Sequence, residues 1–362
     1  MSDAGNTRSS AGRVMRLALI GFGTVGQGVA EILAERREHY VRDFGIDFRI
    51  VAISDINRGS IFDPEGLDPQ ELLDNAGKLE SLNAPHKGWD AVRTIRESNA
   101  DAVLEMAYTD LETGEPGYTH ARSALESGKH IVMSSKGAVA LRFPELLELA
   151  ERNDLSIGVE GTVMSGTPTL ALGTEMLKGA GVTRIEGILN GTTNYILTRM
   201  GEGLAYEDAL AEAQEKGYAE ADPTGDVEGI DAAGKVAILA NLVMDRPLTL
   251  ADVERQGISH ITPADVKDAE SNGEVWKLIA TVDDSRTARV RPERLPLSHP
   301  LAAIGGATNA VTFTTDYLGQ VTLIGPGAGK LETGYAMIGD LLKIHRQRAS
   351  RRHGDPPKEA IT

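Results

Sequence analysis

One lysine and one carboxylate in this chain have the types and the spacing needed for proton transfer. Asp231 and Lys235 lie four residues apart, which places both on one face of a predicted helix. Lys235 is the only polar side chain from 232 to 240, and its face continues to the apolar Ile238 and Leu242. A lysine on such a face is at least partly buried and needs a partner, so we interpret it as an acid–base group. The alternative is an exposed ion pair within the helix.

A second lysine, Lys136, directly follows the apolar run 130–133 and two serines. In an open parallel sheet, ligands bind at the carboxyl ends of the strands, so this position suits a binding site. The alternative is a surface lysine. Glu220 and Asp222 lie in the loop before the lysine-bearing helix, where a carboxylate could hold a substrate ammonium group.

A glycine-rich turn stands at the first apolar run of the chain. Gly21, Gly23 and Gly26 fit the pattern G-x-G-x-x-G, after a predicted strand at 16–20 and before a predicted helix at 29–37. In this context the glycines permit a tight turn, close approach of a pyrophosphate and close helix packing. The alternative is a turn without a ligand. The cofactor contacts expected from this turn are Gly21, Phe22, Gly23, Thr24, Val25 and Gly26.

Two residues near the end of the second predicted strand point to different dinucleotides. Asp55 could bond the hydroxyls of the adenosine ribose and would disfavour a 2′-phosphate. Arg58 could instead bind that phosphate. The choice between NAD and NADP therefore stays open, with a slight preference for NAD or for use of both.

The elements that must position these residues alternate along the chain. Strands are predicted at 16–20, 49–54, 102–106 and 130–133, with helices between them and loops with one short helix at 59–90. This order predicts a parallel sheet with right-handed crossovers. Later elements are a short strand at 156–160, strands at 184–189, 311–315 and 320–324, and helices at 206–215, 226–244 and 332–345.

Composition excludes several classes of protein. The 362 residues carry a net charge of −16, so phosphate would be repelled and nucleic-acid binding is not expected. The chain has no cysteine, which excludes disulfides and thiolate metal sites. No H-E-x-x-H zinc motif, P-loop or apolar run of about 20 residues is present. With no signal-peptide pattern at the start, we expect a cytoplasmic protein that does not bind membranes.

The ordered motifs of the chain resemble the homoserine dehydrogenase family. The resemblance rests on the glycine turn, Lys136, the segments 187–195 and 217–235, His299-Pro300 and 325–329, and it covers about residues 14–345. The segments 187–195 and 217–235 are specific to this family, whereas the glycine turn is not. The resemblance implies a Rossmann-type doubly wound α/β nucleotide-binding domain and an α+β substrate domain with an open sheet.

The resemblance also implies the reaction, which is reversible reduction of L-aspartate 4-semialdehyde to L-homoserine by NAD(P)H. Lys235 would be the acid–base group, with Lys136 a second catalytic lysine and Asp231 holding both substrate and Lys235. Glu220 would bind the substrate amino group. Further substrate contacts are expected from Gly191, Thr192 and Asp226, and further cofactor contacts from Thr109, Ser135, Lys136 and Gly327.

The turn at 160–168 resembles a monovalent cation site of the family. The Glu160 side chain and the carbonyl groups of Val163, Ser165 and Thr167 would hold Na⁺ or K⁺, and the alternative is a plain turn. Two positions depart from the family pattern: Ser135 stands where asparagine is common, and Ala107-Tyr108-Thr109 stands where Thr-Pro-Thr is common. Both lie near the expected nicotinamide region.

We expect the nucleotide-binding domain at 14–140 with 318–345, the substrate and dimerisation domain at 141–317, a flexible tail at 1–13 and a disordered tail at 346–362. A fused kinase or C-terminal regulatory domain is not expected. The resemblance implies a homodimer across the open sheet, or a tetramer of two such dimers. The alternatives are another Rossmann dehydrogenase acting on an amino acid or aldehyde, and a non-catalytic NAD(P)-binding sensor.

Overall fold

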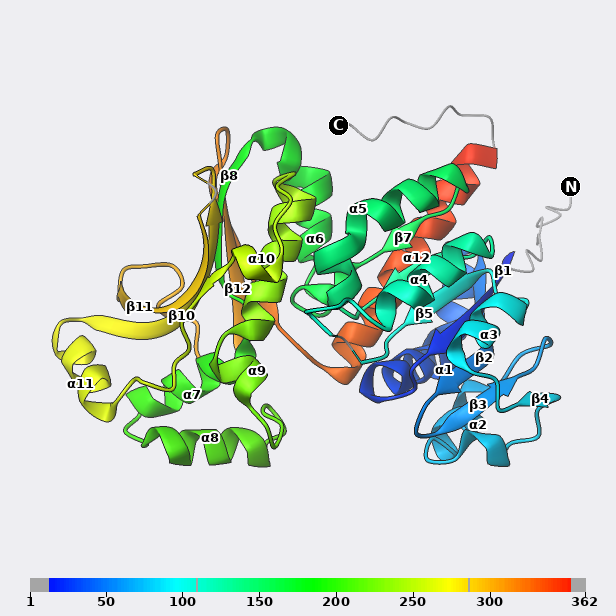
Figure 1. Cartoon of the computed structure of the whole chain (residues 1–362), viewed down its shortest axis with the longest axis horizontal. Helices are drawn as coiled ribbons and strands as arrows, with labels where there is room; N and C mark the ends of the chain where they lie inside the picture. The colour runs from blue at the N-terminus through cyan, green and yellow to red at the C-terminus, as the bar shows by residue number, and fades with distance from the viewer. Residues whose placement is uncertain (1–12, 109, 286, 353–362) are drawn as a thin grey trace, which may run out of the picture.

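The computed structural model describes residues 13–108, 110–285 and 287–352. Within these ranges the chain forms two sheets that lie side by side (Figure 1). The first has seven strands in the order β4-β3-β2-β1-β5-β6-β7, and the second has six in the order β13-β12-β8-β10-β11-β9. The expected α/β class is confirmed, with the parallel nucleotide-binding sheet and a second sheet beside it.

The first sheet is built mainly from parallel strands. They are β1 (Arg13–Ile20), β2 (Ile46–Asp55), β5 (Ala102–Glu105), β6 (His130–Met133) and β7 (Ile157–Gly158). Their apolar runs are buried because helices cover both faces of the sheet. The region 59–90, expected as loops with one short helix, also adds the antiparallel edge strands β3 (Gly59–Phe62) and β4 (His86–Lys87).

Helices from both ends of the chain cover one face of this sheet. The helices α1 (Thr24–Phe44) and α12 (Lys330–Arg352) pack together there with α2 (Pro69–Asp74). At the closest point a Cβ atom on Gly28 would lie 2.0 Å from the Lys330 carbonyl oxygen, so only glycine fits. The other face is covered by α3 (Ala91–Glu97), α4 (Gly117–Glu126) and α5 (Gly137–Arg152).

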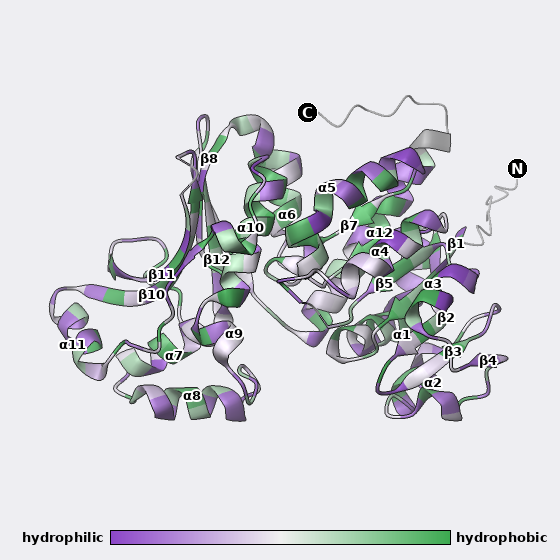
Figure 2. Ribbon diagram, in the orientation of Figure 1, coloured by the Kyte–Doolittle hydropathy of each residue, from purple (hydrophilic) through white to green (hydrophobic). Residues whose placement is uncertain are grey.

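The second sheet has one face packed on a helix. Its strands are β8 (Val182–Ile188), β9 (Glu254–Arg255), β10 (Glu274–Asp283), β11 (Ala288–Pro296), β12 (Thr308–Thr315) and β13 (Gly319–Pro326). Apolar residues of β8, β10 and β12 share a core with the largely buried α10 (Ile230–Val243). Figure 2 shows apolar residues gathered at the strands of the first sheet and along α10, and hydrophilic residues toward outer helices.

Three expected boundaries differ in the structure. The strand β13 lies in the second sheet, so the segment that returns to the first sheet from residue 318 onward begins with α12 instead. The helix expected at 226–244 is divided into α9 (Thr224–Val227) and α10 by Gly229, whose φ is +73°. Residues 346–352, expected as tail, continue α12, and residues 1–12 and 353–362 lie outside the described ranges.

The remaining helices lie around the second sheet or join the two sheets. They are α6 (Thr169–Ala171), α7 (Gly191–Gly201), α8 (Tyr206–Glu215), α11 (Pro263–Ser271) and short single-turn segments. Among the helices within the described ranges, none combines the length and the apolar composition needed to cross a bilayer.

Candidate active site

Lys235 lies near the start of α10 with its side chain largely buried. Only 7% of the side chain is exposed, so the expected burial is confirmed. Its Nζ donates hydrogen bonds to Asp231 Oδ2 at 2.7 Å and to the Leu189 carbonyl oxygen at 2.6 Å. The first contact is set by the helix repeat and the second by the packing of α10 against the end of β8. These two bonds hold the ammonium group in a fixed position.

Asp231 bridges the two lysines that the sequence singled out. Its Oδ2 accepts from Lys235, and its Oδ1 lies 3.3 Å from Lys136 Nζ. Lys136 lies between β6 of the first sheet and α5, so this carboxylate joins side chains from the two halves of the fold. Burial alone would raise the pKa of Asp231, but the two ammonium groups hold it well below its usual range. Asp231 is therefore ionised at neutral pH.

A second carboxylate, Asp226, lies beside this group. Asn190 Nδ2 donates to Asp226 Oδ1 at 2.6 Å and to Asp231 Oδ2 at 3.2 Å, so one amide holds both acids. The Thr192 hydroxyl lies 3.2 Å from Asp226 Oδ2. Burial and the charge of Asp231 raise the pKa of Asp226. The pKa values of the two neighbouring acids therefore shift in opposite directions. Lysines lie next to Asp231, whereas a neutral amide and a hydroxyl group lie next to Asp226.

These side chains line a cleft of about 1030 Å³ between the two sheets. The cleft reaches from Val25 at the start of α1 to Lys235, so the glycine turn and the lysines open onto the same space. Its wall also includes Glu220, Gly191 and Gly327, three of the residues predicted to bind ligands. Asp222 lines the cleft too, as an exposed residue.

The glycine turn has the geometry that close approach of a phosphate requires. Gly21 has φ of +93°, and a Cβ atom on it would lie 2.7 Å from the Met106 carbonyl oxygen. A Cβ atom on Gly26 would lie 2.5 Å from the Gly21 carbonyl oxygen. Gly23, by contrast, faces open space and precedes the first residue of α1. A phosphate can therefore reach the helix N-terminus at Gly23, where backbone N–H groups face it.

Asp55 is positioned at the end of β2 by its own hydrogen bonds. Its Oδ2 accepts from the Phe22 backbone N–H at 2.7 Å, which ties the acid to the glycine turn. Its Oδ1 accepts from the backbone N–H groups of Asn57 and Arg58. Burial would raise the pKa of Asp55, but these three N–H groups lower it below its usual range. The Arg58 guanidinium lies 3.7 Å from the carboxylate, so both candidate ribose contacts are adjacent.

Comparison with known proteins shows the family of this chain. Residues 21–160 match the model of the homoserine dehydrogenase NAD-binding domain, and residues 168–342 match the homoserine dehydrogenase model. The chain is 43% identical over 344 residues to the NAD(+)-dependent homoserine dehydrogenase of Pseudomonas canavaninivorans, covering 93% of this chain and 97% of the relative. The chain belongs to the homoserine dehydrogenase family.

Two other homoserine dehydrogenases are also similar to this chain over nearly its whole length. The homoserine dehydrogenase of Methanocaldococcus jannaschii is 39% identical and is covered over 98% of its length. A hyperthermophilic archaeal homoserine dehydrogenase in complex with NADPH superposes with a TM-score of 0.80 at 31% identity, covering 91% of this chain and 97% of that one. The family assignment predicted from the motifs is thus confirmed over nearly the whole chain.

Three of the predicted cofactor contacts, Phe22, Thr109 and Ser135, are not side chains that the structure shows facing the cleft. The Ser135 hydroxyl is buried and donates to Glu105, so it does not point into the cleft. Thr109 lies outside the described residues. Phe22 is fully buried, so its predicted contact with cofactor would be through the backbone alone.

The turn predicted to hold a monovalent cation is compact. The Glu160 carboxylate accepts from the backbone N–H groups of Leu170 and Ala171 at 2.9 and 2.7 Å. Burial raises the pKa of Glu160 despite these bonds. Ser165 has φ of +55°, so the turn is not a regular right-handed helix and its carbonyl groups do not all point the same way. The Thr167 carbonyl oxygen accepts from the backbone N–H of Thr169 at 2.6 Å.

Sequence reasoning missed two groups that position the lysine centre. Asn190 was noted only as part of a turn, and Leu189 contributes a carbonyl oxygen that no side-chain pattern reveals. The signal for Asn190 was available, because asparagine before Gly-Thr-Thr is a favourable N-cap, and its Oδ1 accepts from the Thr193 N–H at 2.9 Å.

Proposed function

We propose that this protein reduces L-aspartate 4-semialdehyde to L-homoserine with NAD(P)H, and that Lys235 is the acid–base group of the reaction. The observation that carries this proposal is the pair of lysines bridged by Asp231 in a cleft that also receives the glycine turn. A cleft shared by a dinucleotide site and a buried ammonium group suits hydride transfer with protonation of the product oxygen.

The ammonium group of Lys235 has the donors that the reaction needs. A protonated lysine carries three N–H groups, and Asp231 and Leu189 occupy two of them within the described part of the chain. The third can donate to the aldehyde oxygen, polarise the carbonyl group and then protonate the alkoxide. Lys136 adds a second positive charge beside Asp231 that favours the developing negative charge on the oxygen.

The rest of the cleft suits the amino-acid end of the substrate. Glu220 and Asp226 provide carboxylates that bind the substrate ammonium group. Gly191 and Thr192 form the first turn of α7, an 11-residue helix, and its backbone N–H groups suit the substrate carboxylate. These residues would bind both the ammonium group and the carboxylate of the substrate, which would direct its aldehyde group toward the lysines.

The cofactor site is supported by the fit of the residues to a dinucleotide. Gly21, Gly23 and Gly26 admit the pyrophosphate, and Asp55 and Arg58 stand at the adenosine ribose. When bound, the nicotinamide supplies the hydride. The negative charge of Asp55 favours NAD, whereas Arg58 accepts the 2′-phosphate of NADP, so we propose that the enzyme uses both with a preference for NAD.

We further propose a monovalent cation at the turn 160–167. The buried Glu160 carboxylate is supported as a ligand because a cation would offset the cost of its burial. The carbonyl groups of Val163, Ser165 and Thr167 would complete the site, since hard cations prefer oxygen ligands. Among the described residues no group of three or more histidine, cysteine, aspartate or glutamate side chains could hold a metal.

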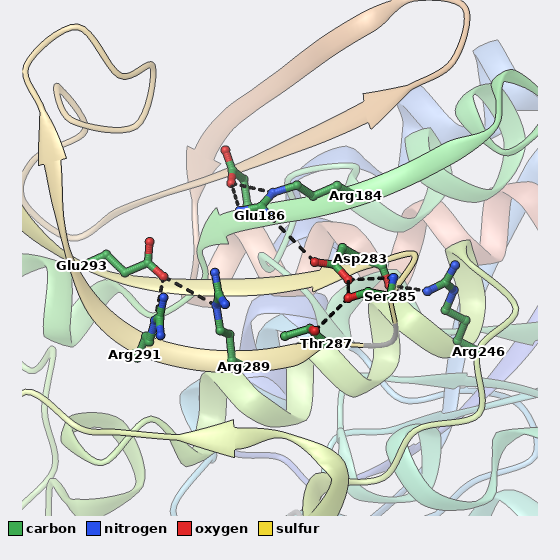
Figure 3. Close-up of polar contacts among 9 residues, drawn as sticks. All are labelled: Arg184, Glu186, Arg246, Asp283, Ser285, Thr287, Arg289, Arg291 and Glu293. Carbon is green, nitrogen blue, oxygen red and sulfur yellow. Dashed lines mark hydrogen bonds and ion pairs between the residues drawn. The ribbon is translucent and has the colours of Figure 1, made fainter.

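We propose that two copies pair through the open face of the second sheet. Figure 3 shows charged side chains on this face, including Arg289, Arg291 and Glu293 on β11 and Arg184 and Glu186 on β8. The strand register places these residues opposite the face that packs on α10. A face that carries both signs of charge can meet a second copy of itself about a two-fold axis. Two such dimers could also form a tetramer.

Initial rates with NADH and NADPH test the reaction. The purified protein is mixed with L-aspartate 4-semialdehyde in the reductive direction, and with L-homoserine or L-aspartate in the oxidative direction. We expect turnover with the semialdehyde and with homoserine, and none with aspartate. Oxidation of aspartate alone would favour another amino-acid dehydrogenase, and binding of NADH without turnover of any substrate would favour a sensor. Parallel rates in KCl, NaCl and a quaternary ammonium salt test the cation.

A further inference from the structure

Asn309 is a buried polar side chain whose amide is unused. The residue is 0% exposed, and neither Oδ1 nor Nδ2 hydrogen-bonds to any residue that the structure describes. Both atoms are essentially inaccessible to water. Buried amides are almost always hydrogen-bonded, because an unpaired one loses its bonds to water without replacement. The described residues, as they are placed, do not supply the partner of this amide.

The strand register places Asn309 close to the backbone segment that holds Lys235. Asn309 is the second residue of β12, and Ala310, which follows it, pairs with Ile188 at the end of β8. Alternation along the strand puts Asn309 on the same face as Val311 and Phe313, which share the core with α10. The residue after Ile188 is Leu189, whose carbonyl oxygen binds Lys235 Nζ.

Two glycines of the cleft wall leave room for the amide. A Cβ atom on Gly327 would lie 2.2 Å from both Cγ and Nδ2 of Asn309, so no other residue fits there. A Cβ atom on Gly191 would lie 3.4 Å from Asn309 Oδ1. Both glycines line the cleft. The amide is therefore separated from the cleft only by the backbone of these two segments.

We propose that Asn309 is a positioning residue for the reduction: when ligands fill the cleft, its carboxamide hydrogen-bonds to the backbone of residues 325–329 and holds this segment over them. The inference rests on the proposed function. A carboxamide offers one acceptor and two N–H donors, which match the C=O and N–H of a peptide group. Gly327 lies with its Cα against the amide. Gly-Pro-Gly-Ala-Gly can rotate its peptide groups readily, and Gly329 already has φ of +149°.

The variant Asn309→Leu tests this role because it should change free and ligand-bound protein in opposite ways. Leucine has a similar shape and no polar atoms, so the Tm of the free protein should stay unchanged or rise. The rise in Tm on adding NADPH with L-homoserine, a pair that cannot react, should be smaller than in the wild type. KM for the semialdehyde and NADPH should rise about tenfold, with a smaller change in kcat, since a hydrogen bond of the bound state is lost.

The matched control is Asn241→Leu in α10. The Asn241 amide already donates to the carbonyl oxygens of Ala140 and Leu248, and its Oδ1 accepts from the Leu248 N–H. Its replacement should lower the Tm of free and ligand-bound protein equally and leave the ligand-induced shift intact. If Asn309→Leu behaves like this control, or if its KM and ligand-induced shift equal those of the wild type, the proposal is overturned.

A double-variant cycle tests the contact with Gly327 directly. Gly327→Ala puts a methyl group into the space of the amide, so KM should rise. In an Asn309→Ala background that space is free, so the same change should raise KM less. Equal rises in both backgrounds would overturn the proposal. A wild-type protein that neither turns over the semialdehyde nor gains stability with these ligands would overturn the proposed function itself, and this inference with it.

Discussion

Asp231 is the residue that joins the two lysines of the cleft. It accepts a hydrogen bond from Lys235 and forms an ion pair with Lys136. The Asn190 amide donates hydrogen bonds both to it and to Asp226. Such a carboxylate keeps two ammonium groups close together, which would otherwise repel each other. In the proposed reaction, two ammonium groups held in this way would stabilise the alkoxide.

The first prediction concerns Lys235, the proposed acid–base residue. Lys235→Ala should lower kcat by about two to four orders of magnitude, the usual size of a general acid–base contribution. The measurement is steady-state reduction of the semialdehyde at saturating NADPH. Lys267→Ala, at an exposed position of α11, is the control and should keep wild-type kcat. Wild-type turnover in the Lys235 variant would remove this lysine from the mechanism.

Asp340 offers a prediction about pH. Burial raises the pKa of Asp340 to about 7, with the Glu160 and Glu175 carboxylates adding to the rise and the Glu160 N–H and Lys343 opposing it. The folded protein thus holds a proton that the unfolded chain releases above about pH 4, so this group destabilises the fold increasingly between about pH 4 and pH 7.

Asp340→Asn removes this dependence because its amide stays neutral. The Tm of the wild type minus that of the variant should fall as pH rises from about 5 to about 8, and then level off. Thermal unfolding at intervals of pH measures it. The exposed Asp208 in α8 gives the control Asp208→Asn, for which this difference should stay flat. A flat difference for Asp340→Asn would show that this acid titrates near its ordinary value.

At the residue scale, the sequence predicted the contacts that form within a single helix. Asp231 and Lys235 share a helix turn, so their contact followed from the interval of four residues alone. Leu189, just after β8, binds Lys235, and Asn190 beside it binds Asp226 and Asp231. These contacts depend on strand pairing between distant segments, which no single stretch of sequence reveals.

Most strands with a strong apolar pattern were predicted from the sequence. The parallel strands of the first sheet are buried runs, so their positions followed from composition. The strand β11 was missed because it alternates buried residues with charged ones on its open face, such as Arg289, Arg291 and Glu293. The strand β10 was missed although residues 277–282 are buried. The helix α7 was missed because it opens with Gly-Thr-Thr, residues with low helix propensity.

The contact between α1 and α12 gives a prediction at this scale. Gly28→Ala would force a methyl group against the Lys330 carbonyl oxygen, so the helices must separate and the free energy of unfolding should fall by about 1–3 kcal/mol. Gly339→Ala in α12 is the matched control, since a Cβ atom there meets nothing within 4 Å. It should instead raise stability by about 0.5–1 kcal/mol. Urea unfolding measures both, and equal stability of the two variants would contradict the packing argument.

At the scale of the whole molecule, the cleft lies between the two sheets. The open face of the second sheet is the one opposite α10. The homodimer proposed for this face predicts a solution mass twice that of the chain by light scattering. Arg289→Glu with Arg291→Glu should shift the mass toward that of one chain, because like charges would then meet across the axis. Arg36→Glu on the exposed side of α1 is the control and should stay dimeric. A wild-type mass of a single chain would refute the dimer.

The return of α12 to the first sheet has a consequence for how the chain is made. Apolar residues of this helix, including Met337, Leu341 and Ile344, complete the core beside β1 and β2. Those strands are synthesised before that helix, so part of this face, beside α1 and α2, stays uncovered until the second sheet has been made. A chain terminated before residue 330 would expose the apolar residues that α12 covers, and we expect such fragments to aggregate and to be degraded quickly.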